Sequence, residues 1–275
     1  MSYQTLIDKS RWFRNQLFEM VVAQGMGHIP SGFSCTEVLI GLYYGGILRI
    51  DPTRPDDPGR DRFIVSKGHA AASLYPILGD LGFFPAAEVQ RYTRPGALLG
   101  MYADIRVPGI ESISGSLGHG LGLACGMALA GRHDRRDYRV VVLLGDGECY
   151  EGSIWESAFF PPHHRLDHVT VIVDRNRLCT LGRTDDLMDQ GDLAAKWASF
   201  GWEAVEVDGH SYASLMPVLE RIKRPGGKPL AIIANTIKGK GVSFMEGVNV
   251  WHNRMPSPEQ AAQARKELAV NCISS

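Results

Sequence analysis

Two short apolar β-forming runs, each followed by polar residues, constrain the fold of this chain more than any other feature. The first run, Val140–Leu144, ends at Gly145-Asp146-Gly147, and the second, Val169–Val173, ends at Asp174-Arg175-Asn176. Runs in which nearly every position is apolar are typical of parallel strands buried on both faces. The carboxyl ends of such strands meet at one edge of a sheet, where ligands of open α/β proteins bind. The stretch Leu143–Gly182 therefore predicts a ligand site at that edge.

The rest of the chain alternates helical and strand patterns, which predicts an α/β fold with a parallel sheet covered by helices on both faces. Further strands are expected at Phe63–Val65, Glu203–Val207 and Leu230–Ala234. Helices are expected at Gln4–Gln24, from His69 to Leu81, and at Pro85–Tyr92, Leu121–Ala130, Ser153–Phe160, Asp192–Phe200, Ser211–Arg224 and Glu259–Leu268. We see no internal repeat or linker, so residues 1–275 are expected to form a single domain.

A capping box is also expected near the N-terminus. Ser34 precedes Glu37 by three positions, in front of a helical pattern that runs to about Tyr44. This spacing predicts that Ser34 caps the helix. Three segments rich in loop-forming residues are expected to be irregular: Asp51–Asp61, Arg94–Gly109 and Thr236–Pro258.

The composition indicates an ordinary globular protein. Of the 275 residues, 44% are hydrophobic and 21% are charged, and the formal net charge is -1. No global field therefore attracts the chain to nucleic acid or to an anionic membrane, and no apolar stretch approaches the ~20 residues that span a bilayer. The five cysteines are scattered and contain no C-x-x-C pair, so we expect reduced thiols in a cytoplasmic protein.

The polar residues at the two strand ends predict a magnesium site. Magnesium prefers near-octahedral oxygen ligands at roughly 2.1 Å, often one or two carboxylates together with phosphate oxygens. Asp146, Asn176 and a backbone carbonyl near Leu178 would supply three ligands. Two diphosphate oxygens and a water would complete the set. The alternative is that Asp146 and Asn176 are ordinary turn residues that hold no metal.

Five motifs in one order connect this chain to a known family. GDGECYEGS followed by DRN resembles the thiamine-diphosphate motif of transketolases, and so do GMGHIPSG, SKGHAAASLYPIL, PGIESISGSLGHGLG and NTIKGKGVSFME with the later WH. The resemblance covers about residues 5–256. In that family this region is the diphosphate-binding domain, the N-terminal half of a longer polypeptide. The resemblance therefore implies the N-terminal subunit of a split transketolase.

The resemblance implies a set of cofactor contacts. His69 follows Ser66-Lys67-Gly68 at a helix start, where free N–H groups favour anions, so the residues themselves also suggest a diphosphate contact. A histidine that merely caps the helix is the alternative. The resemblance places thiamine diphosphate against Gly115 and Leu117, although small-residue helix packing also explains that motif. The metal implied is Mg²⁺ or, in its place, Ca²⁺ or Mn²⁺. The other implied cofactor contacts lie around this metal, at Gly145, Asp146, Gly147, Glu148 and Asn176.

Two further histidines match the family's substrate-facing positions. His28 lies in a turn flanked by glycine and proline, and His252 lies in the VWH segment. With His69, they are the candidate catalytic residues, because imidazoles donate hydrogen bonds and move protons near neutral pH. A plain loop role is the alternative for each. Glu151 and Glu156 match acidic residues of a subunit-interface network in the family, and an ordinary helix-start charge explains Glu156 equally well.

One position departs from the family pattern. Where transketolases usually have Gly-His-Pro before PG-x-E, this chain has Gly100-Met101-Tyr102. The family histidine helps to hold a hydroxyl of the ketose donor, whereas Met101 can neither donate a hydrogen bond nor carry a proton. The donor therefore differs, or the loop compensates.

The function expected from the resemblance is transfer of a two-carbon ketol unit between sugar-type substrates. The resemblance also implies that this chain has a partner, a C-terminal subunit that carries the pyrimidine-binding domain and the activating glutamate, in an α2β2 assembly. One alternative is decarboxylation of pyruvate or a related 2-oxo acid with acyl transfer to a carbonyl acceptor, and another is a non-catalytic subunit with a regulatory role. A Rossmann dehydrogenase ranks last, because no G-x-G-x-x-G stands at a first strand–helix turn.

Overall fold

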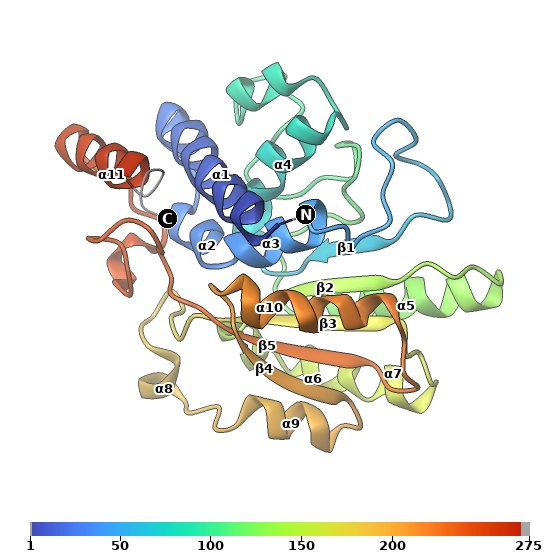
Figure 1. Ribbon diagram of the computed structural model, residues 1–275. Helices are drawn as coiled ribbons and strands as arrows, with labels where there is room; N and C mark the ends of the chain where they lie inside the picture. Colours follow the sequence, from blue (N-terminus) through green and yellow to red (C-terminus); the bar gives the residue numbers. More distant parts are fainter. Residues whose placement is uncertain (1, 271–275) are drawn as a thin grey trace.

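The computed structural model describes residues 2–270, which form a parallel sheet between two layers of helices (Figure 1). The strands are β1 (Arg62–Val65), β2 (Val140–Gly145), β3 (Val169–Arg175), β4 (Glu203–Asp208) and β5 (Leu230–Asn235). Their order across the sheet is β1-β2-β3-β5-β4, and every neighbouring pair is parallel. The predicted α/β fold class is therefore confirmed.

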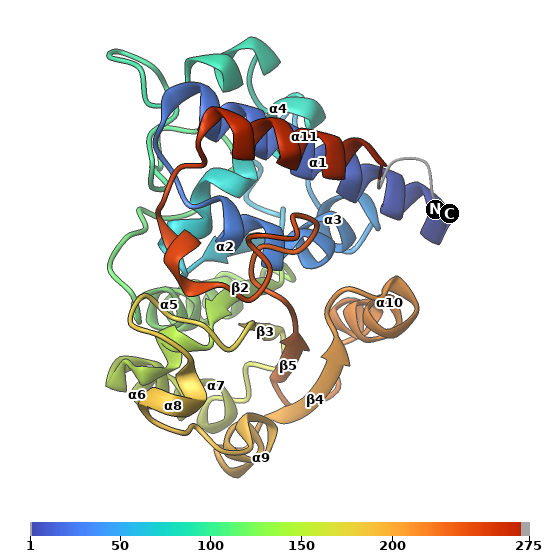
Figure 2. The same ribbon diagram turned by 90° about the vertical axis from the view of Figure 1, so that its left-hand side faces the viewer.

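Helices from both ends of the chain cover one face of the sheet. They are α1 (Tyr3–Gln24), α2 (Ile29–Ser34), α3 (Thr36–Tyr44), α4 (Leu74–Leu81), α10 (Tyr212–Leu219) and α11 (Pro258–Val270). The other face carries α5 (Gly120–His133), α6 (Gly152–Ala158), α7 (Phe160–His163) and α9 (Leu193–Ser199). In Figure 2, α1 and α11 lie side by side, and Arg265 pairs with Glu19 between them. The short helix α8 (Thr184–Leu187) lies in a connection.

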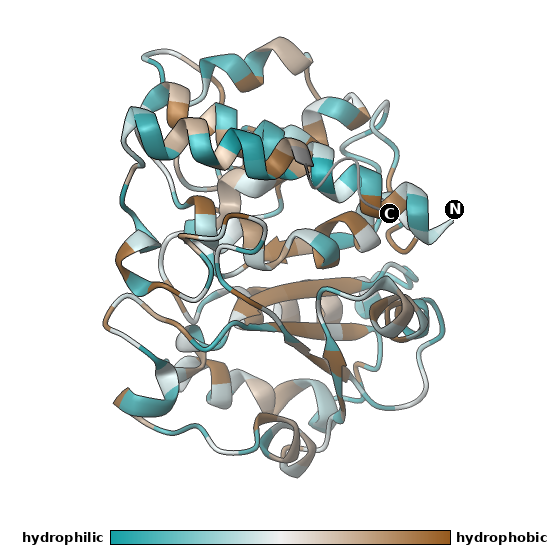
Figure 3. Cartoon of the chain, turned by 60° about the vertical axis from the view of Figure 1, so that its left-hand side comes forward, coloured by the Kyte–Doolittle hydropathy of each residue, from teal (hydrophilic) through white to brown (hydrophobic). Residues whose placement is uncertain are grey.

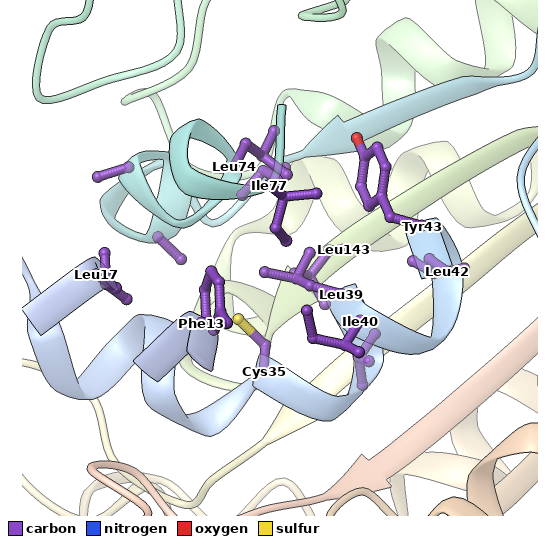
Figure 4. Close-up of a cluster of buried hydrophobic side chains, with 14 of the residues drawn as sticks. Phe13, Leu17, Cys35, Leu39, Ile40, Leu42, Tyr43, Leu74, Ile77 and Leu143 are labelled. Carbon is purple, nitrogen blue, oxygen red and sulfur yellow. The ribbon is translucent and has the colours of Figure 1, made fainter. Parts of the chain in front are cut away.

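The strands divide their side chains between two cores. In β2, Val141 and Leu143 join the core beneath α1, α3 and α4, while Val140, Val142 and Leu144 join the core beneath α5 and α6. This alternation is the period-two geometry of a strand with both faces covered. Figure 3 shows the resulting apolar strands at the centre, with hydrophilic helix faces outside. Figure 4 shows the first core gathered around Leu143.

Several elements differ from the predicted ones in type or extent. Residues His69–Leu81 are not one helix: a 3-10 helix, η1 (Gly68–Ser73), precedes α4, and Pro85–Tyr92 contains another, η2 (Ala86–Arg91). Ser153–Phe160 and Ser211–Arg224 are likewise each divided, the latter into α10 and η4 (Glu220–Lys223). Two further 3-10 helices occur, η3 (Gly147–Tyr150) and η5 (Asn249–His252). Cys272 lies outside the described residues.

The predicted capping box is wrong. α2 ends at Ser34, and the N-cap of α3 is Cys35, whose side chain makes no capping hydrogen bond. Ser34 Oγ instead lies 2.5 Å from Asp174 Oδ2, beneath the sheet edge. The Glu37 carboxylate accepts two hydrogen bonds from Arg14, at 2.7 and 2.9 Å. Its Oε2 also lies 2.8 Å from His210 Nδ1. Partners so distant in sequence outcompete the local cap.

We expect Glu37 to contribute strongly to stability. Burial opposes its ionisation, but Arg14 and His210 lower the pKa of this carboxyl to about 2. A carboxyl with a depressed pKa stabilises the fold above its unfolded-state pKa, and this stabilisation is lost as the pH falls towards 2. Glu37→Gln should therefore reduce the free energy of unfolding by about 3 kcal/mol at pH 7, because Arg14 stays buried without its counter-charge.

Urea denaturation at pH 7, 5 and 4 checks this, and the gap between wild type and variant should narrow as the pH falls. The matched control is Glu19→Gln, because Glu19 and its ion-pair partner Arg265 are both about half exposed. This substitution should lower the free energy of unfolding by less than about 1 kcal/mol. Equal effects of the two substitutions would contradict the buried-pair argument.

Candidate active site

The structure brings Asp146, Asn176 and Leu178 to one edge of the sheet. Gly145 at the end of β2 pairs with Asp174 in β3, so the two chain segments that follow start side by side. The Asp146 carboxylate accepts hydrogen bonds from the N–H groups of Gly147, at 2.8 Å, and Arg177, at 2.5 Å. Arg177 stands between Asn176 and Leu178, whose N–H donates to Asn176 Oδ1 at 3.1 Å. The two adjacent loops after β2 and β3 therefore present carboxylate, amide and carbonyl oxygens at one edge.

This edge suits a divalent cation. Asp146 is only 2% exposed, and burial together with the nearby Asp174 raises its pKa to about 6. A buried carboxylate whose ionisation is this unfavourable is stabilised by a bound cation. Residues 2–270 contain no group of three or more His, Cys, Asp or Glu side chains that could hold a metal. A cation here would therefore rely on amide, carbonyl and ligand oxygens, a set that fits magnesium with a diphosphate.

A buried ion pair supports this edge from below. Lys67 follows β1 and pairs with Asp174 in β3, and both side chains are fully buried. Lys67 Nζ also donates to the carbonyl of Ser31 at 3.1 Å, while Thr236 and Ser34 donate to Asp174. Burial alone would raise the pKa of Asp174, but Lys67 and these donors hold it below its usual value. Sequence reasoning missed the pair, which joins two strand ends far apart in the chain.

Lys238 is a second buried lysine, and no carboxylate lies within salt-bridge distance of it in the described chain. Its side chain is 2% exposed, and Nζ lies 2.7 Å from His252 Nδ1 and 3.3 Å from the carbonyl of Leu178. Burial and the neighbouring Lys67 lower its pKa to about 8. A buried cation without an anionic partner is costly, so this position fits an anionic ligand. The residue belongs to the NTIKGKG motif, where sequence reasoning gave it no role.

The three candidate histidines converge from separate elements. His28 precedes α2, His69 lies in η1 and His252 ends η5. Their ring centroids are 5.8 Å apart for His28 and His69, and 5.3 Å apart for each of the other two pairs. Burial is the main reason why the pKa of each is lowered, reaching about 3 for His252. The cluster therefore consists of neutral imidazoles.

These rings line a cavity of about 250 Å³. Gly115 and Leu117 line it as well, as do Tyr102, Thr180 and Asn253, for which sequence reasoning gave no site role. At Gly68, an added Cβ would meet the N of Gly115 at 2.4 Å, so two backbone segments approach closely there. Gly115 itself has φ of 123°, a conformation that favours glycine.

Gly147 and Glu148 have internal roles that the motif did not predict. A Cβ at Gly147 would meet Cys179 Cβ at 2.8 Å, so glycine allows the loops after β2 and β3 to pack. The Glu148 carboxylate is buried and accepts hydrogen bonds from the N–H groups of Gly118, at 2.9 Å, and Gly145, at 3.1 Å. Ser66 Oγ donates to it as well. Glu148 thereby joins three loops at the sheet edge, and burial raises its pKa despite these donors.

Comparison with known proteins agrees with this geometry. A family model described as "Transketolase, thiamine diphosphate binding domain" matches residues 7–274. The chain is 39% identical over 269 residues to an apulose-4-phosphate transketolase subunit of Phocaeicola vulgatus, covering 98% of this chain and 95% of that one. It is 40% identical over 256 residues to the 6-deoxy-6-sulfo-D-fructose transketolase subunit SqwG of a Clostridium species, covering 93% of each.

Longer relatives match through only part of their length. Human transketolase is 38% identical over 264 residues, which are 94% of this chain and 41% of the human protein. Among solved structures, transketolase from Campylobacter jejuni superposes with a TM-score of 0.92 at 26% identity, covering 100% of this chain and 44% of the other. The chain thus spans less than half the length of these proteins.

The fold and the site together define a thiamine-diphosphate-binding α/β protein. The chain belongs to the transketolase family, through its thiamine-diphosphate-binding domain, and is a subunit of a thiamine-diphosphate-dependent transferase. The resemblance seen in the motifs is therefore confirmed, and relatives of matching length are named as transketolase subunits. None of the described helices combines the length and apolar character needed to cross a membrane.

We expect Glu148 to stabilise the loops of the site even when no ligand is bound. Glu148→Ala would leave three buried donors unpaired, at about 1–3 kcal/mol each before relaxation, so unfolding should become easier by at least about 2 kcal/mol without any cofactor. Chemical denaturation of the cofactor-free protein measures this. The control is Glu151→Ala, since Glu151 is exposed and should change stability by no more than about 0.5 kcal/mol. Unchanged stability of the Glu148 variant would contradict the assignment.

Proposed function

We propose that this chain binds thiamine diphosphate through a divalent cation and, with a second subunit, transfers a two-carbon ketol unit between a sugar-type donor and acceptor. The observation that carries the proposal is that a buried acid, Asp146, and a buried lysine, Lys238, both lie at this sheet edge without forming an ion pair. Neither has a side-chain partner of opposite charge within salt-bridge distance among the described residues. A metal-bound diphosphate would neutralise both.

Each candidate residue of the sheet edge has a role in this proposal. Asp146, Asn176 and the Leu178 carbonyl would hold Mg²⁺, or Ca²⁺ or Mn²⁺ in its place. Gly145 and Gly147 would let the backbone approach the diphosphate, with Glu148 holding the loops around it. His69, Gly115 and Leu117 would contact the cofactor from the cavity side. When bound, thiamine diphosphate supplies an electron sink for the substrate's carbonyl carbon.

The histidines would handle the substrate. His28, His69 and His252 are neutral, and a neutral imidazole has one nitrogen that donates a hydrogen bond and one that accepts. The Lys238 ammonium can only donate, and it lies 2.7 Å from His252 Nδ1. The ring proton of His252 is therefore on Nε2, the atom that lies 3.2 Å from Thr180 Oγ1. His252 would thus present an N–H to a substrate hydroxyl and exchange protons there.

A second polypeptide is part of the proposal. The relatives of matching length are named as subunits of transketolases. We infer a C-terminal transketolase subunit that carries the pyrimidine-binding domain and the activating glutamate, in an α2β2 assembly. The described cysteines are free thiols, which supports a reducing cytoplasmic location.

Sugar chemistry is favoured over the alternatives. The relatives are named for apulose 4-phosphate and 6-deoxy-6-sulfo-D-fructose, which are sugar derivatives. These names support ketol transfer over decarboxylation of pyruvate or another 2-oxo acid. The complete set of metal and diphosphate candidates argues against a non-catalytic regulatory role.

Asp146→Ala should abolish magnesium-dependent cofactor binding by the assembled complex. Removing the carboxylate should weaken affinity for thiamine diphosphate more than roughly 100-fold, beyond what loss of a supporting residue costs. Isothermal titration with Mg²⁺ and with EDTA measures this, alongside the free energy of unfolding without cofactor. Asp186→Ala is the control, because the Asp186 side chain is 75% exposed. Equal affinity in wild type and Asp146→Ala would refute the metal assignment.

The purified chain alone should not turn over substrate, because the activating glutamate would come from the partner. Mixing with the co-purifying subunit should restore activity, measured as ketose consumption with saturating thiamine diphosphate and Mg²⁺. The control is the isolated partner under the same conditions. Full turnover by this chain without its partner would refute the two-subunit proposal.

A further inference from the structure

One side chain of the histidine-lined cavity has no role so far. Tyr102 is 43% exposed, lines this cavity and belongs to the long connection between η2 and α5. Its predecessor, Met101, stands where sequence comparison would place a donor-binding histidine, and a thioether cannot donate a hydrogen bond. Tyr102 is the neighbouring residue that reaches the cavity and can donate one.

The backbone around Tyr102 is fixed on both sides. Tyr75 Oη donates to the carbonyl of Tyr102 at 2.9 Å. The next residue, Ala103, donates its N–H to Ser114 Oγ at 3.0 Å and accepts from the Ser114 N–H at 3.2 Å. The connection is therefore tied to itself, next to Gly115.

The ring of Tyr102 lies next to Gly115. A Cβ added at Gly115 would meet three ring atoms of Tyr102 at 3.5 to 3.8 Å, so the ring lies in van der Waals contact with the space beside this glycine. Gly115 is itself a candidate cofactor contact and lines the same cavity. Tyr102 therefore lines the cavity together with Gly115 and the three histidines.

The hydroxyl group of Tyr102 is available for a ligand. It makes no hydrogen bond to any residue from 2 to 270. Nearby, the Tyr92 hydroxyl is fully buried and also lacks a partner there. The Tyr92 ring centroid lies 6.0 Å from that of Tyr75, whose hydroxyl donates to the Tyr102 carbonyl, and burial raises the pKa of Tyr92 to about 12. A Cβ at Gly27, beside His28, would lie 3.2 Å from the Tyr92 hydroxyl.

We propose that the Tyr102 hydroxyl binds a hydroxyl group of the ketose donor and so determines donor preference at this site. This inference rests on the proposed function. A phenol both donates and accepts a hydrogen bond, and a sugar hydroxyl can satisfy both roles, whereas the carboxylate of a 2-oxo acid only accepts. A site with polar groups built for a hydroxyl discriminates against ligands that leave one of those groups unpaired.

The test compares wild type with Tyr102→Phe in the assembled complex, loaded with thiamine diphosphate and Mg²⁺. The donors are xylulose 5-phosphate, fructose 6-phosphate and sedoheptulose 7-phosphate, the ketose phosphates seen in solved Pichia stipitis transketolase complexes. For each donor that is used, KM should rise roughly 2- to 10-fold, as expected for one neutral hydrogen bond, while kcat changes less than about 2-fold. Tyr3→Phe, with a side chain 44% exposed on α1, should change neither constant.

The outcomes separate this inference from the proposed function. Unchanged KM in Tyr102→Phe, with intact cofactor affinity and measurable ketose turnover, would overturn the role of Tyr102 alone. A wild-type complex that turns over none of the three ketoses is assayed with apulose 4-phosphate and 6-deoxy-6-sulfo-D-fructose, the sugars for which relatives are named. No turnover of these either would overturn both proposals. A fall in cofactor affinity in Tyr102→Phe would show that the hydroxyl serves the cofactor and not the donor, and would also overturn the inference.

Discussion

The buried pair between Lys67 and Asp174 is the interaction on which the sheet edge depends. Neither side chain is accessible to water, so each charge is tolerable only because the other lies beside it. Through Ser31 and Thr236 the pair also contacts helix α2 and the segment that leaves β5. Four segments that are far apart in sequence thereby meet at one point. The candidate site residues Asn176 and Lys238 lie on the segments that this ion pair joins.

Above this neutralised pair lie charges that the described residues do not neutralise. Asp146 and Lys238 are both buried, and neither forms a salt bridge with a described side chain. Burying charge in this way costs stability, and active sites are where proteins accept that cost. The arrangement is complementary to a cation and a diphosphate bound together, because the cation would lie against Asp146 and the anion against Lys238.

Sequence patterns predicted β2, β3 and β5 because each is built on an apolar run with at most one polar residue, and they predicted the turn at Asp146 because glycines flank it. They failed where a partner comes from a distant element. Ser34 reads as a local cap, yet Asp174 takes its hydroxyl, and Glu37 pairs with Arg14 on another helix. Such contacts have no sequence period, so no local pattern can indicate them.

The sequence by itself determined the fold class, the family motifs and the residue types at the sheet edge, since apolar periodicity and glycine placement are local properties of the chain. Only the tertiary structure decided which side chains meet there. It placed three histidines in one cavity, put Lys238 against His252, and brought Tyr102 to the lining of the same cavity. Distances and burial arise from packing several elements at once, and the electrostatic state of each group follows from that packing.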